Sequence, residues 1–305
     1  MKKILAVLLV TLLVLTGCKS TPNDNPSADH DGKINVVATT TMIKDLVEIV
    51  GGDKVAVNGM MVAGVDPHLY KAKPSDVKAI QEADIVAFNG VHLEAKLDDV
   101  LSGLEGSGKN IIKLEDALEP SDIINDEEQG GHDPHIWFDV NLWKKSAQHV
   151  ANKLSDFDSE NKDFYQTNAA NYITELNDME GYIKNRIAEI PEEQRVLVTA
   201  HDAFAYFGRY FGVHVEAIQG ISTQSEAGIA DINDVSDLIV SRKIKAIYTE
   251  SSVPKKTIES LQAAVKDRGF DVSIGGEIYS DSLKEDTSYI ETYKINVDTI
   301  VDNLK

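Results

Sequence analysis

The stretch NKDFYQTNAANYITELNDMEGYIKNRIAEI, residues 161–190, decides how the rest of the chain is organised. Its apolar residues recur at steps of three and four from Phe164 to Ile190, which is the spacing of one helical stripe. Pro191 follows and is expected to end the helix. At about 1.5 Å per residue the helix would be about 45 Å long. We therefore predict one stiff helix that joins two lobes, with a single larger sheet beside an ordinary long helix as the alternative.

Short β-rich runs alternate with helical patterns on both sides of this helix, which favours mostly parallel sheets and an α/β fold. Four strands are expected in each half, so the predicted lobes are 33–160 and 191–305. The strands are expected at 34–39, 55–62, 84–90 and 110–116, and at 194–200, 213–219, 245–250 and 272–279. The helical patterns between them lie at 41–51, 73–83 and 93–103, and at 202–211, 229–243 and 254–269.

The N-terminus has the pattern of a secretion signal. Lys2 and Lys3 precede an apolar run that is too short for a comfortable membrane span. The run ends in LTGC at 15–18, which resembles a bacterial lipobox, so we predict a signal peptide over 1–17 and lipidation of Cys18. The alternative is an ordinary signal peptide with an accidental cysteine. Cys18 is the only cysteine, so the chain has no internal disulfide and no thiolate metal site.

Residues 18–32 are polar and contain two prolines, so they are expected to form a flexible tether to the membrane. The formal net charge of the chain is −20, and removal of 1–17 would leave about −22. A chain this acidic is a poor candidate for binding nucleic acid, because phosphates would be repelled.

Three histidines and one aspartate follow strands of the two predicted sheets. His68 and His135 come from the first half, and His201 and Asp281 come from the second. Ligands of open α/β sheets bind at the carboxyl ends of the strands, so all four side chains are expected to face one site between the lobes. Three imidazoles and one carboxylate are a complete ligand set for a divalent transition metal.

Two of these histidines share a local motif, Asp-Pro-His, at 66–68 and 133–135. Proline restricts its own φ and the residue before it, so each loop has less freedom to lose on binding. Asp66 and Asp133 are expected to accept hydrogen bonds from loop amides or to steady a ligating ring, and Glu250 is expected to assist from a strand end.

Each candidate also has an ordinary structural explanation. His68 could be a surface loop residue, His135 a core histidine, and His201 or Asp281 a helix cap. Their shared place at strand ends favours the metal site. The remaining histidines are expected to be idle, to cap helices or to pack. His132 is expected to be a solvated loop residue, with a spare ligand as the alternative, and the others are His30, His92, His149 and His214.

Longer motifs extend this interpretation to a family. VDPHLY, NGVHLEAKL, DPHIWFD, TAHDAFAYFGRYFG, AIQGISTQSEAG, YTESSV and GGEIYSDSL, together with the lipobox, make residues 33–305 resemble the manganese/zinc receptor lipoproteins of bacterial ABC importers, the cluster A-I solute-binding proteins. The resemblance implies two (β/α)4 lobes joined by a rigid helix, and a metal held in the cleft between them by His68, His135, His201 and Asp281. It also implies a monomeric, lipid-anchored receptor on the outer face of the cell membrane that delivers the ion to a permease with a cytoplasmic ATPase.

Two departures from the family pattern affect the choice of metal. Some manganese-specific members have glutamate where this chain has His201, and the third imidazole shifts the site toward zinc. Many zinc-specific members carry a long His-rich loop, whereas residues 119–135 here contain only His132 besides His135. We expect manganese as the transported ion, with zinc as the close alternative and iron also possible.

Two other functions fit a three-histidine site. A zinc hydrolase would need an open coordination position, which Asp281 would close, and the chain has no G-x-S-x-G or H-E-x-x-H motif. A surface adhesin with a structural metal would be largely unfolded without the ion. We expect a transport receptor and not an enzyme, with the hydrolase and the adhesin as the alternatives.

Overall fold

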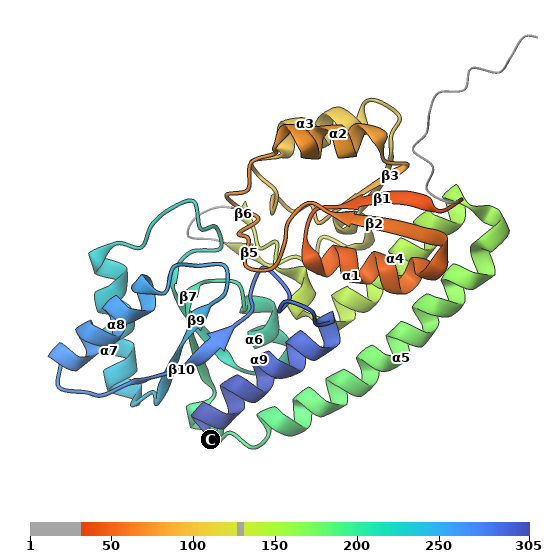
Figure 1. Cartoon of the computed structure of the whole chain (residues 1–305). Coiled ribbons are helices and arrows are strands. Elements are labelled where there is room, and N and C mark those ends of the chain that lie inside the picture. The colour runs from red at the N-terminus through yellow and green to blue at the C-terminus, as the bar shows by residue number, and fades with distance from the viewer. Residues whose placement is uncertain (1–31, 127–130) are drawn as a thin grey trace, which may run out of the picture.

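The computed structural model describes residues 32–126 and 131–305 (Figure 1). Outside these residues lie the predicted signal peptide, the predicted lipidation residue Cys18, His30 and nearly all of the predicted tether. Within the described residues, no helix combines the length and the hydropathy of a membrane span.

The first half of the chain folds into a lobe around a four-stranded parallel sheet. Its strands are β1 (Ile34–Ala38), β2 (Val55–Gly59), β3 (Ile85–Phe88) and β4 (Asn110–Lys113), and its helices are α1 (Thr41–Gly51), α2 (Pro74–Glu82), α3 (Asp98–Glu105) and α4 (Val140–Phe157). The strand order is β2-β1-β3-β4. Helices α2 and α3 cover one face and α1 and α4 the other (Figure 1), so the central strands are Val-, Ile- and Ala-rich.

The second half repeats this plan. Its strands are β7 (Val196–His201), β8 (His214–Gln219), β9 (Ala246–Glu250) and β10 (Ser273–Ile278), and its helices are α6 (Ala205–Phe211), α7 (Ile229–Arg242), α8 (Lys256–Asp267) and α9 (Tyr289–Leu304). β7 pairs with β8 and β9 with β10, both in parallel, and β7 lies against β9. Helices α7 and α8 lie on one side of these strands and α6 and α9 on the other (Figure 1).

Helix α5 (Lys162–Ile187) joins the two lobes and runs along both of them (Figure 1). Its 26 residues span about 39 Å at about 1.5 Å per residue. It packs against α1 and α4 of the first lobe and α9 of the second. The α/β class and the long connecting helix are thus confirmed, although the helix ends at Ile187 and not at residue 190. The exact domain limits stay a prediction.

Buried apolar side chains form three clusters. The largest, which we call the shared core, contains residues of both lobes and of α5, from Ile34 to Leu304. A second cluster lies within the C-terminal lobe, under α7 and α8. A third, the outer N-lobe cluster, lies under α2 and α3 and includes Val37, Met61 and Ile80. The shared core makes the two lobes one packed body.

The prediction of a helix over 93–103 was wrong at its start, because α3 begins at Asp98. The preceding loop turns through positive φ angles at Val91 and His92. The buried carboxylate of Glu94 accepts hydrogen bonds from the backbone amides of Asn89 and Gly90, which holds the loop in this turn. The sequence pattern also did not predict α9 or the short antiparallel pair β5 (Asn125–Asp126) and β6 (Gly131–His132).

Several predicted strands are shorter than expected; for example, β2 ends at Gly59 and β4 at Lys113. Short 3-10 helices fill other connections: Gly52–Lys54, Leu114–Ala117, Ile136–Phe138, Ser159–Asn161 and Glu192–Gln194.

Candidate metal centre

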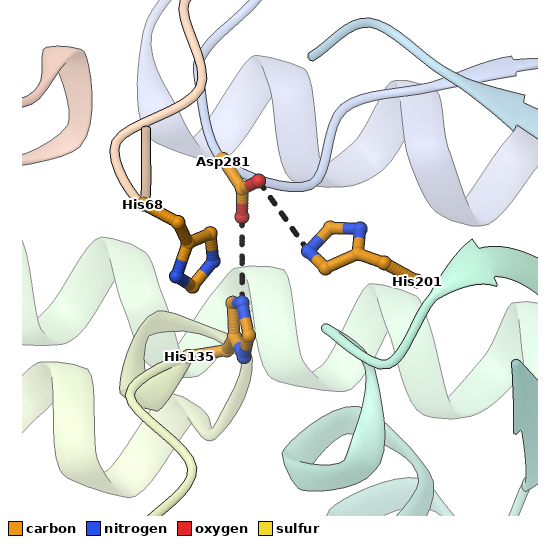
Figure 2. Close-up of side chains that lie close together, drawn as sticks. All are labelled: His68, His135, His201 and Asp281. Carbon is orange, nitrogen blue, oxygen red and sulfur yellow. Dashed lines mark ion pairs between the residues drawn. The ribbon is translucent and has the colours of Figure 1, made fainter. Parts of the chain in front are cut away.

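Four side chains from four separate loops or strand ends meet between the lobes (Figure 2). His68 lies in the loop between β2 and α2, His135 directly precedes the Ile136–Phe138 turn, His201 is the last residue of β7, and Asp281 follows β10. All four are buried, with at most 2% of each residue exposed. One ligand atom from each residue lies within 4.8 Å of the others, which is close enough for the four to surround one ion.

The carboxylate of Asp281 faces two of the imidazoles. Its Oδ1 lies 3.5 Å from His135 Nε2, and its Oδ2 lies 3.4 Å from His201 Nε2. The ring of His68 completes the group, with its centroid 5.3 Å from that of His135 and 5.9 Å from that of His201. Each oxygen of Asp281 therefore points into the space that the rings enclose (Figure 2).

The two Asp-Pro-His motifs form the same backbone turn. Asp66 Oδ1 accepts a hydrogen bond from the His68 amide at 2.8 Å, and Asp133 Oδ1 accepts one from the His135 amide at 2.9 Å. An aspartate that binds the amide two residues ahead closes a tight turn, and the intervening proline stiffens it. The motif thus fixes the backbone of each histidine before an ion binds.

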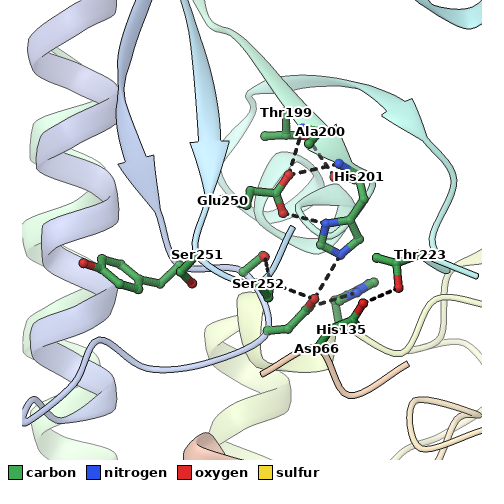
Figure 3. Close-up of polar contacts among 12 residues, drawn as sticks. Asp66, His135, Thr199, Ala200, His201, Thr223, Glu250, Ser251 and Ser252 are labelled. Atoms are coloured by element: carbon green, nitrogen blue, oxygen red, sulfur yellow. Dashed lines mark hydrogen bonds and ion pairs between the residues drawn. The ribbon is translucent and has the colours of Figure 1, made fainter. Parts of the chain in front are cut away.

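Buried carboxylates hold two of the three rings. Asp133 Oδ1 lies 2.7 Å from His135 Nδ1. Glu250 Oε2 lies 2.5 Å from His201 Nδ1, and Oε1 of the same residue accepts hydrogen bonds from the amides of Ala200 and His201 (Figure 3). A carboxylate on Nδ1 keeps the proton there and leaves the Nε2 lone pair for an ion.

Asp66 acts differently from Asp133. Its second oxygen, Oδ2, accepts a hydrogen bond of 2.6 Å from Thr223 Oγ1 in the C-terminal lobe (Figure 3). Asp281 Oδ2 likewise accepts one from Ser252 Oγ at 3.2 Å. Sequence reasoning missed Thr223 and Ser252, because single hydroxyl residues in loops carry no recognisable pattern.

The charges of the group are strongly coupled. Burial lowers the pKa of His68 to about 3. Burial also disfavours a charged His135 ring, but Asp133 and Asp281 outweigh it and raise its pKa to about 9. Glu250 and Asp281 raise the pKa of His201 well above its usual value despite burial. Burial opposes ionisation of Asp281, yet His201 and its neighbours hold its pKa well below the usual range. When no ion is bound, the neighbouring carboxylates therefore favour the charged forms of His135 and His201.

The atoms that face the centre lack other partners. Among the described residues, no hydrogen bond reaches Nε2 of His68, His135 or His201, or Oδ1 of Asp281. Leaving buried polar atoms unpaired is unfavourable by about 1–3 kcal/mol each. A divalent cation would satisfy all four at once, and three nitrogens with one carboxylate suit a transition metal better than calcium or magnesium.

The other described histidines lie outside this group. His92 is exposed, and its Nδ1 lies 3.6 Å from Asp98 Oδ2. His132 forms a hydrogen bond of 2.7 Å between its Nδ1 and Asn125 Oδ1. His149 is partly buried on α4, and His214 lies near Glu216 on β8. His132 is therefore no spare ligand in this structure.

Comparison with known proteins shows the family of the chain. Residues 36–303 match the family described as "Zinc-uptake complex component A periplasmic". The manganese-binding lipoprotein MntA of Bacillus subtilis is 38% identical over 306 residues, covering 99% of each chain. The zinc-binding protein TroA of Treponema pallidum is 40% identical over 279 residues, covering 90% of each.

The fold agrees as well. The solved structure of periplasmic zinc-binding TroA from Treponema pallidum superposes with a TM-score of 0.86 at 39% identity, covering 90% of this chain and 99% of that one. The family match extends over nearly all the described residues, and the two relatives align along most of their own length. The chain belongs to the family of periplasmic A components of zinc-uptake complexes.

Proposed function

We propose that this protein is an extracytoplasmic solute-binding lipoprotein that captures a divalent transition metal and delivers it to an ABC permease. The proposed ligands are His68, His135, His201 and Asp281. The observation that carries the proposal is their burial around one point, with four of the atoms that face this point making no hydrogen bond. The names of the relatives, manganese-binding lipoprotein and zinc-binding protein, support the same function.

Capture is an exchange of protons for the ion. Asp133 and Glu250 hold the Nδ1 protons, so His135 and His201 can present Nε2 once that nitrogen loses its proton. His68 is already neutral because burial lowers its pKa to about 3. Asp281 supplies negative charge to the centre, and the carboxylates behind the rings add to it.

Manganese is the proposed cargo, with zinc as the alternative. The relative that aligns with 99% of this chain is named for manganese, and the one that aligns with 90% is named for zinc. The three imidazoles suit zinc, and zinc binds more tightly than manganese at nearly any such site. Affinity measured in a test tube therefore does not identify the transported ion.

The receptor would work from the outer face of the membrane. Relatives are named substrate-binding lipoproteins of ABC transporters, which supports lipid anchoring through Cys18. Solute-binding proteins of ABC importers act with a permease and its ATPase, and we propose that this one does so as a monomer. The matched family consists of binding proteins, so the zinc-hydrolase alternative is set aside.

Uptake in cells tests this function. In a strain that lacks the gene, wild-type protein should restore manganese uptake, whereas His201→Ala and Asp281→Ala should not. His214→Ala removes an exposed imidazole outside the site and is the matched control. Restored uptake by His201→Ala would contradict the proposed site, and restoration of zinc uptake alone would make zinc the cargo.

A further inference from the structure

His68 is held less firmly than the other three proposed ligands. Buried carboxylates bind the rings of His135 and His201, and Ser252 donates to Asp281. Within the described parts of the chain, no hydrogen bond reaches Nε2 of His68, and no carboxylate forms an ion pair with its ring as at the other two histidines. Only its backbone amide is fixed, by Asp66.

The apolar packing next to His68 also differs from the packing next to the other three proposed ligands. Residues next to the other three ligands belong to the shared core, among them Trp137, Phe204 and Leu283. The loop that carries His68, residues 60–73, contains no helix or strand and packs instead on the outer N-lobe cluster, through Met61 and the partly buried Tyr70. Parting the lobes would expose the shared core, whereas displacing this loop would not.

Two hydroxyl groups of the C-terminal lobe hold this loop in place. Thr223 Oγ1 donates to Asp66 Oδ2 at 2.6 Å, and Ser282 Oγ accepts from the Gly64 amide at 2.9 Å. The two contacts lie on the same short stretch as His68, and Leu69, the residue after it, is 47% exposed. The loop therefore lies between the site and solvent, with the ligand His68 buried and the next residue at the surface.

We infer that the 60–73 loop, and not a whole lobe, moves to admit and release the ion, and that Thr223 and Ser282 are positioning residues that hold the loop closed. The inference rests on the proposed function. The movement is a local opening of a weakly packed segment, of the kind that costs far less than global unfolding. It removes one ligand of four and leaves the other three in their hydrogen-bonded positions.

The test is the rate at which bound manganese leaves the protein, measured by stopped flow against excess chelator. Thr223→Val keeps the side-chain shape but removes the donor, and we expect dissociation about tenfold faster, as loss of one hydrogen bond to a carboxylate implies. Thr223→Ser keeps the donor and should restore the wild-type rate. Thr174→Val, the same change at an exposed hydroxyl on α5, is the control.

Hydrogen–deuterium exchange gives a second readout. Amides of 60–73 should exchange faster in metal-free than in loaded protein, and faster still in Thr223→Val, while 133–139 and 196–201 change little. An unchanged dissociation rate in Thr223→Val, or opening of 133–139 in place of 60–73, would overturn the inference. Failure of wild-type protein to bind any divalent metal would instead overturn the proposed function.

Discussion

Replacing Glu250 with glutamine tests how the protein prepares an imidazole for the ion. Glu250 is 1% exposed, and it accepts from two backbone amides at 2.8 and 2.9 Å while its other oxygen lies 2.5 Å from His201 Nδ1. Glutamine has one acceptor oxygen. If that oxygen stays on the amides, the NH2 group faces Nδ1, which must then become an acceptor. The proton moves to Nε2, and the ring can no longer bind an ion in that form.

The expected loss in manganese affinity for Glu250→Gln is about 10- to 100-fold, which corresponds to about 1.4–2.8 kcal/mol. Isothermal titration calorimetry at pH 7.5 measures it. Glu94→Gln is the matched control, because Glu94 is equally buried and accepts from two backbone amides but touches no imidazole. Equal affinities for Glu250→Gln and wild type, or equal losses in both variants, would refute this role for Glu250.

Three further predictions follow from the charges and contacts. Neighbouring carboxylates raise the pKa of His135 to about 9 without the ion, so manganese affinity should rise with pH from 5 to 9, as calorimetric titrations at several pH values would show. Binding should also release protons, which calorimetry in buffers of different ionisation enthalpy detects. An affinity that does not change with pH would exclude histidine ligation. Asp66→Ala should weaken manganese binding without abolishing it, since it removes contacts to the His68 amide and Thr223 but no ligand. Equilibrium titration of the variant with manganese measures this change in affinity. Burial raises the pKa of Asp45 to about 6. Its ionisation therefore lowers the free energy of unfolding progressively as pH rises from about 4 to 6, by at most about 3 kcal/mol. Asp45→Asn should raise the melting temperature at pH 8 but not at pH 4.

The sequence predicted the architecture because its signals are local. The stripe of α5 and the β-rich runs each follow from residue spacing, and the stretch 41–51 forms α1 as expected. The start of α3 was not predictable in this way. It depends on Glu94 folding back onto two amides of its own loop, and a carboxylate in a helical pattern does not show which donors it will meet.

The candidate site followed from a rule of topology. Strand ends on one edge of a parallel sheet converge, so His68, His135, His201 and Asp281 could be grouped without coordinates, and the structure brings them together. The contacts that support them were only partly foreseeable. Asp133 sits two residues from its histidine, whereas Thr223 lies 157 positions from Asp66 along the chain and meets it only through folding.

The central claim is that these four side chains bind one divalent ion. Anomalous diffraction from crystals grown with manganese, and separately with zinc, tests it most directly. The account predicts one strong peak between the lobes, bound by a nitrogen of each histidine and an oxygen of Asp281, at about 2.0–2.2 Å in the zinc crystals. A peak elsewhere, or one that His68 or His201 does not reach, would contradict it.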